Sequence, residues 1–419
     1  MIDALNFMAE MEQECSDFRK DLSGLDLEEQ IDILKLSCSQ IYPEEEIRDK
    51  MERAMKSKES LKIQIGIDPL SMELQIARIP PLVLGSKLQR MGHSITILIG
   101  DFSALIEDPS DIYKNKMNLN RKVIAKNFKR VRKHLESFLD FTKANTVYNS
   151  AWLKDLKFQD FIELIKEIKV SDSIEVCNFG SNADNGKNLS YAELVYPIIM
   201  GIDSLEISPD IEIAKHDQFY NLKMSRYIMG IKGQEPESIM VTAALPHQDD
   251  CFSINEKPIN IFKYISTLNK EDVIQWFKLL TEITPETLEN LKERLNKRLL
   301  DLESTKEILS KIIINRLYDE TTSRESYIKY IKERVKKTET EEIRMISGST
   351  MSIGEFIAAS TELTLSEVQE VIDSGGARAL SCDGECLTYI IDGGAEIGSI
   401  NFDKFYILMS DKQVLRIIK

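Results

Sequence analysis

The chain lacks any long uninterrupted run of apolar residues. A membrane-spanning helix needs about 20 predominantly apolar residues in a row, so the sequence predicts no membrane segment and no membrane partner. Residues 1–20 are acidic and mixed in character, unlike a secretory signal or a transit peptide. These two absences lead us to expect a cytoplasmic protein.

Cysteine is scarce and scattered. The six cysteines are Cys15, Cys38, Cys177, Cys251, Cys382 and Cys386. A large chain expected in a reducing compartment argues against a disulfide framework. The spacing of Cys382 and Cys386 suits half of a metal site, but no second Cys or His pair lies nearby in the sequence. We therefore expect neither disulfides nor a bound metal.

An excess of positive charge is also missing. The chain has 54 Lys and Arg against 69 Asp and Glu, a net charge of −15. Proteins that grip phosphate backbones concentrate basic side chains on one face, so RNA binding would need a local basic patch. The basic runs at residues 126–133, 292–298 and 329–337 are each typical of a solvated helix face.

The composition that remains is that of an ordinary globular protein, with 42% hydrophobic and 29% charged residues over a length of 419. A chain of this length is expected to form two to four folding units. Residues 61–67 and 94–99 have strand patterns, and residues 79–91 between them have helical spacing. This order predicts an α/β fold with a parallel sheet and crossover helices.

The remaining pattern predicts a division into parts. Further helices are expected at residues 120–139, 158–168 and 191–200, strands at 203–208 and 238–243, and an almost wholly helical stretch at 269–337. The predicted parts are an N-terminal helical segment at 1–58, an α/β domain at 59–260, a helical domain at 261–340, a linker at 341–351 and a small mixed domain at 352–419. Gly375-Gly376 and Gly393-Gly394 are expected to make turns in the last part.

Several short motifs follow one another in a specific order. The first stretch contains Gly66-Ile67-Asp68-Pro69, Leu74-Gln75-Ile76-Ala77-Arg78, Gly92-His93, Ile99-Gly100-Asp101-Phe102 and Asp108-Pro109-Ser110. Later motifs are Tyr148-Asn149-Ser150-Ala151-Trp152-Leu153, Tyr196-Pro197-Ile198-Ile199-Met200-Gly201-Ile202-Asp203, His216-Asp217-Gln218-Phe219-Tyr220-Asn221 and Gly233-Gln234-Glu235-Pro236. In order and spacing they resemble tyrosyl-tRNA synthetase, a class I aminoacyl-tRNA synthetase, in its bacterial form.

The resemblance extends over nearly the whole chain and implies its architecture. It implies a Rossmann-like class I synthetase catalytic domain at residues 59–260 and an anticodon-binding-like helical domain at 261–340. It also implies a small S4-like α+β domain at 352–419. Because the family is dimeric, a homodimer is expected.

The resemblance further implies an amino-acid pocket. Tyr196 and Asp108 match positions that contact the α-ammonium of the substrate, where a charge-assisted hydrogen bond is favourable. Gln218 is retained at another pocket position. Asp203 matches the acid that accepts the phenol hydrogen bond, and a buried acceptor of this kind rejects phenylalanine.

Two pocket positions depart from the family. Met200 replaces a glutamine that helps to hold the ammonium, and Gln64 replaces a tyrosine that shares the phenol hydroxyl in many members. The expected ligand is therefore tyrosine or an altered amino acid. The alternative is that Tyr196, Asp203 and Gln218 are inherited core polar residues without a ligand.

The nucleotide side departs further. The family's signature histidines are Gln75 and Arg78 here, and its glycine, which lets the adenine lie against the backbone, is Ala77. The mobile basic loop is shortened to residues 247–253, and residues 233–256 contain no Lys or Arg. Several charge-stabilising groups for phosphoryl chemistry are thus missing.

Three residues would hold a nucleotide if binding is retained: Asp68, Lys215 and Asp217. By the resemblance, Asp217 is the acid that binds the ribose. Lys215 replaces a glycine beside it, where a long side chain would fill the ATP space or make a new contact. No cofactor is expected, and ATP with Mg²⁺ would be needed only if activity persists.

The S4-like end is expected to repel RNA. Arg378 is the single Lys or Arg between residues 352 and 400, a stretch that contains nine acids. We therefore expect a degenerate paralogue, a pseudoenzyme that binds an amino acid as a sensor, regulatory or partner protein and does not bind tRNA. The alternatives are a repurposed amino-acid ligase that uses Arg78, Lys215 or His247, a divergent tyrosine-tRNA ligase, and a structural protein with an empty pocket.

Overall fold

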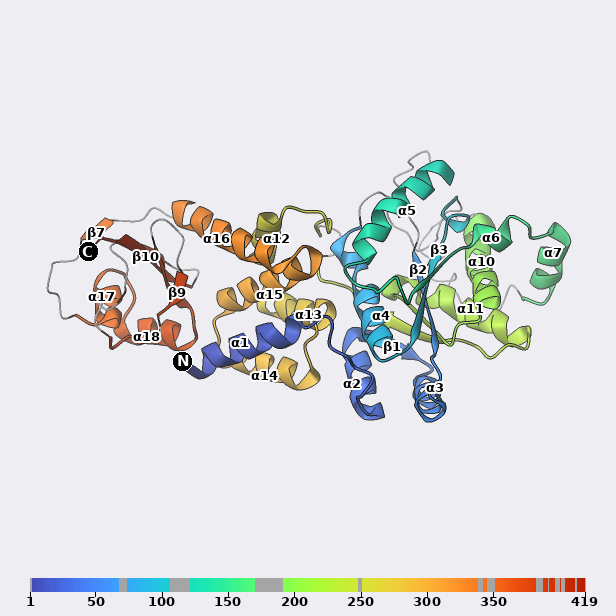
Figure 1. The fold of residues 1–419 in the computed structure, drawn as a ribbon, viewed down its shortest axis with the longest axis horizontal. Helices are drawn as coiled ribbons and strands as arrows, with labels where there is room; N and C mark the ends of the chain where they lie inside the picture. The colour runs from blue at the N-terminus through green and yellow to red at the C-terminus, as the bar shows by residue number, and fades with distance from the viewer. Residues whose placement is uncertain are drawn as a thin grey trace. The chain divides into compact units, whose positions relative to one another are not determined.

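The structure is a computed structural model. It describes residues 2–67, 74–105, 121–169, 191–247, 251–337, 342–344, 351–381, 387–390, 392–395, 400, 404–410 and 413–418. The chain forms two compact units, one of residues 19–255 and one of residues 1–18 with 256–419. Figure 1 shows the elements of both units.

The unit of residues 19–255 is built on a six-stranded sheet in the order β1-β6-β5-β2-β3-β4. Its strands are β1 (Cys38–Tyr42), β2 (Lys62–Ile67), β3 (Ser94–Ile99), β4 (Asn145–Tyr148), β5 (Ile211–Lys215) and β6 (Ser238–Thr242). β1 runs antiparallel to β6, and the other neighbouring pairs are parallel. The predicted α/β sheet with strands near residues 61–67, 94–99 and 238–243 is confirmed.

Helices and short turns connect these strands. The helices are α2 (Leu27–Ser37), α3 (Glu44–Ser57), α4 (Pro80–Arg90), α5 (Arg121–Leu135), α6 (Ser150–Leu153), α7 (Phe158–Lys166), α10 (Tyr191–Ile207) and α11 (Phe219–Ile231). Short 3₁₀ turns are η1 (Ile76–Arg78), η2 (Ser103–Leu105) and η3 (His216–Gln218). α4 carries proline in its first turn, where a missing N–H costs nothing, and it packs along β2, β3 and β5 (Figure 1).

Helices α10 and α11 pack against each other at close range. A Cβ added to Gly201 would lie 2.5 Å from Cδ1 and 3.1 Å from Cβ of Ile228, so only glycine permits this approach. The expected strand at residues 203–208 is wrong, because residues 203–207 form the last turns of α10. Ile198 and Ile202, one helical turn apart, are buried in the same core cluster as Ile228, and this packing favours the helix.

The expected helical segment at residues 1–58 is also corrected. Residues 38–42 form the edge strand β1 beside β6, and residues 1–18 belong to the other unit. The short sequence Cys38-Ser39-Gln40-Ile41-Tyr42 lies between two longer helical patterns that obscured its strand character. The pairing partner β6 lies about 200 residues away in the chain, so local periodicity could not reveal it.

The other unit begins as a group of helices around α15. Its helices are α1 (Ile2–Ser16), α12 (Pro258–Ile265), α13 (Lys270–Leu280), α14 (Pro285–Asn296), α15 (Leu302–Leu317) and α16 (Glu320–Lys337). α15 packs against α1, α12, α13 and α16, and eleven of its residues are buried. The predicted helical stretch at residues 269–337 is confirmed.

The same unit ends in a small α+β domain. Its sheet has the order β7-β11-β10-β8-β9, with β7 (Glu342–Arg344), β8 (Ala377–Ser381), β9 (Leu387–Tyr389), β10 (Lys404–Met409) and β11 (Gln413–Ile418), and its helices are α17 (Ile353–Ala359) and α18 (Leu365–Asp373). Gly375 has φ +79°, as its predicted turn requires. The predicted linker at residues 341–351 is wrong in part, because β7 pairs in parallel with β11.

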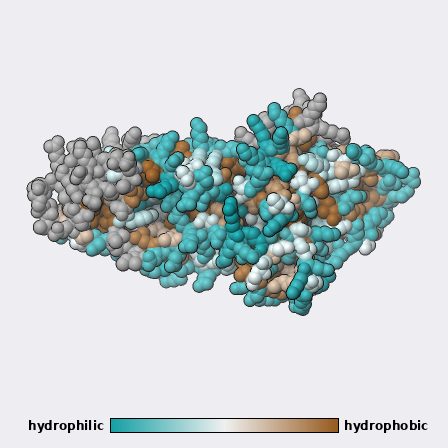
Figure 2. All heavy atoms as spheres, viewed as in Figure 1, coloured by the Kyte–Doolittle hydropathy of each residue, from teal (hydrophilic) through white to brown (hydrophobic). Residues whose placement is uncertain are grey.

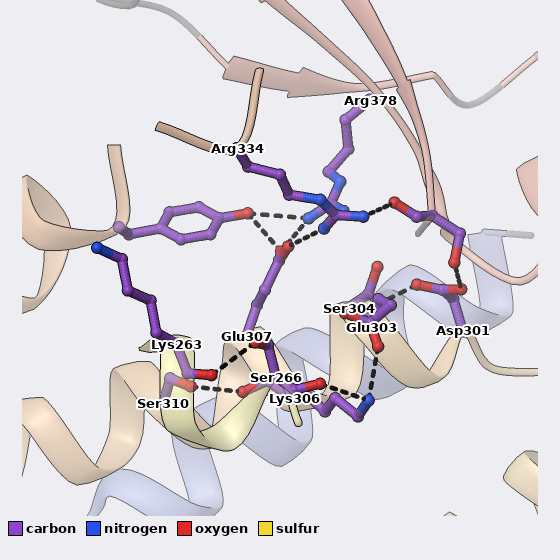
Figure 3. Close-up of polar contacts among 12 residues, drawn as sticks. Lys263, Ser266, Asp301, Glu303, Ser304, Lys306, Glu307, Ser310, Arg334 and Arg378 are labelled. Atoms are coloured by element: carbon purple, nitrogen blue, oxygen red, sulfur yellow. Dashed lines mark hydrogen bonds and ion pairs between the residues drawn. The ribbon is translucent and has the colours of Figure 1, made fainter. Parts of the chain in front are cut away.

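A buried ionic network joins this small domain to the helices (Figure 3). Arg378 of β8 donates to the carboxylate of Glu307 on α15 and to the hydroxyl of Tyr327 on α16, the latter at 3.0 Å. The Tyr327 hydroxyl donates to Oε2 of Glu307 at 2.8 Å. Arg334 of α16 lies 3.5 Å from Oε1 of Glu307 and donates to the carbonyl of Ser410. The guanidinium of Arg378 is fully buried.

The visible face in Figure 2 is mostly hydrophilic over the described residues. Within the described part of the chain, no helix has the length and apolar character needed to cross a membrane.

Candidate functional site

A cavity opens at the centre of the six-stranded sheet, where β2 and β5 lie side by side and the strand order reverses direction. Gly66 and Ile67 at the carboxyl end of β2 line it, with Ala214 and Lys215 at the carboxyl end of β5. Open parallel sheets bind ligands at this switch point. The cavity offers about 150 Å³ to the centres of water molecules, and one water needs about 10–15 Å³ on that scale, so a small metabolite fits.

The cavity gathers most of the residues that the sequence singled out. Eight of the predicted residues line it: Gln64, Arg78, Tyr196, Met200, Asp203, Lys215, Asp217 and Gln218. Gln75 and Ala77 are not among its lining residues. The predicted residues Asp68 and Asp108 lie outside the described residues.

Helix α10 supplies three of the lining side chains. Tyr196, Met200 and Asp203 follow one another at spacings of four and three, which places them on one helix face. Tyr196 and Asp203 are buried. These three predicted residues therefore lie together on one helix that continues through Asp203. The sequence had predicted a strand to begin at Asp203.

Asp203 is oriented by two neighbours that the sequence reasoning had not assigned to the site. The indole Nε1 of Trp152 donates to its Oδ1 at 2.7 Å, and Nδ2 of Asn149 donates to its Oδ2 at 3.1 Å. Asn149 is itself fixed, since it donates to Oγ of Ser103 at 3.0 Å and accepts from the Phe102 N–H at 2.9 Å. Asn149 and Trp152 both belong to the motif at residues 148–153, which is the feature of the sequence that could have indicated their role.

A second carboxylate, Glu212 of β5, lines the same cavity and was missed. It lies opposite Gln64 in the register of β5 and β2, and the Gln64 side chain hydrogen-bonds to it. Burial raises the pKa of Glu212 to about 7, against hydrogen bonds that lower it. The signal in the sequence was an acid between two isoleucines in a buried strand, Ile211-Glu212-Ile213.

Behind Glu212 lies another buried acid, Glu237. Burial and the neighbouring Glu212 carboxylate hold the pKa of Glu237 well above its usual range, and the two side chains are hydrogen-bonded. Oγ of Ser204 lies within hydrogen-bond distance of both acids, at 3.5 Å from Glu212 and 3.3 Å from Glu237. Glu237 thus keeps its proton more readily than Glu212, which leaves Glu212 as the carboxylate toward the cavity.

The cavity lining also includes an ion pair. Nζ of Lys215 lies 2.8 Å from Oδ2 of Asp217, and the two side chains are about 31% and 27% exposed. Asp217 and Gln218 belong to η3, and Oε1 of Gln218 accepts from Nδ2 of Asn221 at 3.0 Å. The acid that the sequence assigned to ribose is therefore already engaged with a cation.

Residues 74–76 are hydrogen-bonded to residues 252–254 through the backbone. The Ile76 N–H donates to the carbonyl of Phe252 at 3.0 Å, and the Ile254 N–H donates to the carbonyl of Leu74 at 2.9 Å. Gln75 pairs with Ser253 as an antiparallel bridge. With its amide nitrogen turned toward this segment, Gln75 also donates to the carbonyls of residues 251 and 252 at 2.8 and 3.1 Å. Gln75 therefore has a structural role at the cavity's edge.

Within the described residues, no group of three or more His, Cys, Asp and Glu side chains is arranged to hold a metal ion. Cys382 and Cys386 lie outside the described residues.

Comparisons with known proteins agree on one family. A sequence model of tRNA synthetases class I (W and Y) matches residues 55–333. The tyrosine--tRNA ligase of Carboxydothermus hydrogenoformans is 27% identical over 368 residues, which cover 84% of this chain and 90% of that protein. The tyrosine--tRNA ligase of Thermotoga maritima is 26% identical over 373 residues, with 85% and 90% covered.

Solved structures show the same fold at low sequence identity. A C-terminally truncated mitochondrial tyrosyl-tRNA synthetase from Aspergillus nidulans has a TM-score of 0.62 at 13% identity, covering 78% of this chain and 99% of that chain. The tyrosyl-tRNA synthetase of Archaeoglobus fulgidus, crystallised with L-tyrosine, has a TM-score of 0.57 at 16% identity, covering 72% and 100%.

Proposed function

The chain belongs to the tRNA synthetases class I (W and Y), as a member of the tyrosyl-tRNA synthetase family, and we propose that it binds an amino acid without activating it or charging tRNA. In this proposal it acts as a sensor, regulatory or partner protein and forms a homodimer like the family that it resembles. The amino-acid side of the cavity, the nucleotide side and the C-terminal domain each support one part of it.

The amino-acid side of the cavity supports ligand binding. Tyr196 and Asp203 are buried beside Gln64 and Gln218 around one cavity, and Asp203 is held in place by Asn149 and Trp152. Burying an ionisable carboxylate and orienting it costs stability. The presence of Asp203 in the cavity wall therefore supports a role in binding a ligand. Because the relatives are tyrosine--tRNA ligases, the proposed ligand is tyrosine or a related amino acid.

The observation that carries the loss of activation is the ion pair of Lys215 with Asp217 at 2.8 Å. The ammonium engages Oδ2 of Asp217 and leaves Oδ1 without a hydrogen-bond partner. Lys215, which also lines the cavity, therefore competes with a ribose hydroxyl for one of the two carboxylate oxygens. Gln75 is engaged with the backbone of residues 251 and 252, within the shortened loop. A loss of preorganised charge-stabilising groups costs about 3–4 kcal/mol each in the transition state.

The C-terminal domain supports the loss of tRNA binding. Arg378 is the single Lys or Arg between residues 352 and 400, and its guanidinium is buried against Glu307. A basic side chain in a buried ion pair cannot neutralise a phosphate. The relatives are tRNA ligases by name, so this is the part of the proposal that departs furthest from them.

A divergent, active tyrosine-tRNA ligase is the second candidate. It is favoured by the similarity to tyrosine--tRNA ligases over about 84% of this chain. The two candidates differ in one measurable reaction, tyrosine-dependent exchange of pyrophosphate into ATP. Exchange at background level is expected, and exchange clearly above an ATP-only control would establish the ligase instead.

Ligand binding is tested separately by thermal shift across amino acids, each with and without ATP. An amino acid at a hundredfold over its Kd should stabilise the protein by about 2.7 kcal/mol, and ATP should add nothing. Asp203→Asn should reduce the shift, and Asp155→Asn, at an exposed acid, should leave it unchanged. A protein that no amino acid stabilises would contradict the proposed function.

A further inference from the structure

Two hydrogen-bond acceptors face each other in the cavity wall where β2 meets β5. Gln64 and Glu212 lie opposite each other on β2 and β5, and both side chains line the cavity. Asp203 lines it from α10. Three acceptor-bearing side chains from three different elements therefore line one cavity, whose walls also include Leu74, Leu82 and Leu98.

The acceptors are not equally satisfied. The two oxygens of Asp203 already accept from Trp152 and Asn149. Gln64 is about 1% exposed, and its Oε1 has no hydrogen-bond partner in the structure. An unpartnered buried carbonyl costs about 1–3 kcal/mol, so Gln64 is in a state that a donor from a ligand would relieve.

Glu212 has hydrogen-bond partners, but they do not offset the cost of its burial. It receives hydrogen bonds from Gln64, from Ser204 and from its neighbour Glu237, and the contact with Ser204 is long, at 3.5 Å. Burial still dominates and raises the pKa of Glu212 to about 7. The nearest cation behind the pair, Lys50, donates to the carbonyls of Asp210 and Pro236 at 2.9 and 2.8 Å and not to Glu212. A donor from the cavity would therefore stabilise the carboxylate.

A phenol satisfies Gln64 and Glu212 poorly. Its hydroxyl supplies one donor for two acceptors and brings an additional acceptor oxygen beside them. A nitrogen with two N–H groups supplies two donors, one for Oε1 of Gln64 and one for the Glu212 carboxylate. Hydrogen bonds to an ionised acceptor are the stronger kind.

We infer that the pocket takes an amino acid with an apolar aromatic body whose side chain ends in a nitrogen bearing two hydrogen-bond donors, with Gln64 and Glu212 as the specificity-determining residues. This inference rests on the proposed function, since it names the ligand class of the same site. It departs from the relatives, which are tyrosine--tRNA ligases.

The test compares three ligands with the same ring: L-phenylalanine, L-tyrosine and L-4-aminophenylalanine, with zero, one and two terminal donors. Calorimetry on the full chain at pH 8 should show 4-aminophenylalanine binding at least tenfold more tightly than tyrosine, and tyrosine more tightly than phenylalanine. Glu212→Gln should reduce the tenfold preference to threefold or less, because one acceptor oxygen becomes a donor group. Glu206→Gln, on the exposed side of α10, should leave the preference intact.

The outcomes separate this inference from the function on which it rests. Tyrosine binding as tightly as 4-aminophenylalanine to the unaltered protein overturns the inference and leaves amino-acid binding standing. No binding of any of the three overturns both. If Glu212→Gln does not fold, Gln64→Leu replaces it, with the same expected loss of preference, and an unchanged preference in either folded variant also overturns the inference.

Discussion

At the scale of single residues, two buried carboxylates in one cavity differ in how they are supported. Asp203 has a donor on each oxygen, from Trp152 and from Asn149. Glu212 has a raised pKa of about 7 because burial outweighs its hydrogen bonds. The two carboxylates should therefore respond differently to a change of pH or to the substitution of a neighbouring residue.

Glu212 should make the protein less stable as pH rises. The folded-state pKa of about 7 lies above the ordinary value of 4.5, so between these values the folded state keeps a proton that the unfolded state has lost. Stability then falls by up to about 1.4 kcal/mol per pH unit over that window and stays reduced above it. Glu212→Gln removes this loss.

Urea unfolding at pH 5 and at pH 8 measures the effect. The free energy of unfolding of Glu212→Gln, relative to the unaltered protein, should rise by about 1–3 kcal/mol from pH 5 to pH 8. Glu206→Gln, at an exposed acid of the same helix as Asp203, serves as the control and should show no such change. A difference that is equal at both pH values would contradict the assigned pKa of Glu212.

Lys215 should block nucleotide binding through Asp217. Lys215→Ala removes the ammonium at 2.8 Å from the carboxylate and should let ATP raise the melting temperature where it does not in the unaltered protein. Lys232→Ala breaks a similar pair with Glu167 at 2.7 Å away from the cavity and should not. If ATP stabilises the unaltered protein as much as Lys215→Ala, the ion pair is not a barrier.

At the scale of elements, the edge of the cavity is set by backbone pairing. Residues 74–76 and 252–254 are joined by hydrogen bonds at 2.9–3.0 Å and by the bridge of Gln75 with Ser253. Side chains at η1 are placed by this pairing, which brings Arg78 to the cavity while Gln75 faces the paired segment.

The contact of α10 with α11 gives a second prediction at this scale. Gly201→Ala places a Cβ 2.5 Å from Cδ1 of Ile228, and overpacking of this kind costs about 1–3 kcal/mol of unfolding free energy. Because α10 also carries Tyr196 and Asp203, the affinity for the amino acid should fall together with the unfolding free energy. Adding Ile228→Val, which removes Cδ1, should restore part of both losses.

Gly24→Ala is the matched control, since a Cβ there meets nothing within 4 Å. Its unfolding free energy should change by no more than about 0.5 kcal/mol. Equal effects of the two alanines would show that backbone freedom, and not the contact with α11, decides the cost at Gly201.

The hydrophobic pattern of the sequence predicted helices and strands best where one face of the element is buried and the other is not. β2, β3 and α7 appear within about two residues of their expected positions. Asp203 was expected at the start of a strand because residues 203–208 have no clear helical stripe of their own, and only packing on α11 fixes them as helix. β1 and β7 depend on partners far away in the chain.

The site divides in the same way. The placement of Tyr196, Asp203 and Gln218 around one cavity could be predicted, because the order of motifs matched a family. Glu212 could not, because its role depends on the register of β5 with β2, which brings it opposite Gln64. The pairing of Lys215 with Asp217 depends on the turn into η3, although their spacing of two residues made a contact possible.

At the scale of the whole molecule, the unit of residues 1–18 and 256–419 is held together by charge as well as by apolar packing. Glu307 accepts a hydrogen bond from Arg378 of the small domain, as Figure 3 shows. It also accepts one from Tyr327 of α16. Oγ of Ser410 also donates to Oδ1 of Asp301 at 2.6 Å. These bonds tie the small domain to the helices at several points.

Breaking this network should be costly. Arg378→Met leaves Glu307 buried without its main cation, and removal of one partner of a buried pair costs about 3–5 kcal/mol of unfolding free energy. Combining it with Glu307→Leu should recover part of the loss, because the uncompensated charge is gone. Urea unfolding with limited proteolysis of the small domain measures both.

Lys297→Met is the control, because its partner Glu293 and its own side chain are both about 60% exposed. It should cost no more than about 0.5 kcal/mol. A cost of that small size for Arg378→Met would mean that the small domain is held by apolar packing alone.

The burial of Arg378 has a consequence for how this protein can be divided. A chain ending near residue 350 would lose the guanidinium and leave the Glu307 carboxylate, with Tyr327, at a newly uncovered surface of α15 and α16. Arg334 of α16, at 3.5 Å from Glu307, would then be left with water to satisfy the carboxylate in place of Arg378. The small domain covers these buried polar groups of the helical core. Measurements on a shortened chain would therefore not represent the full chain.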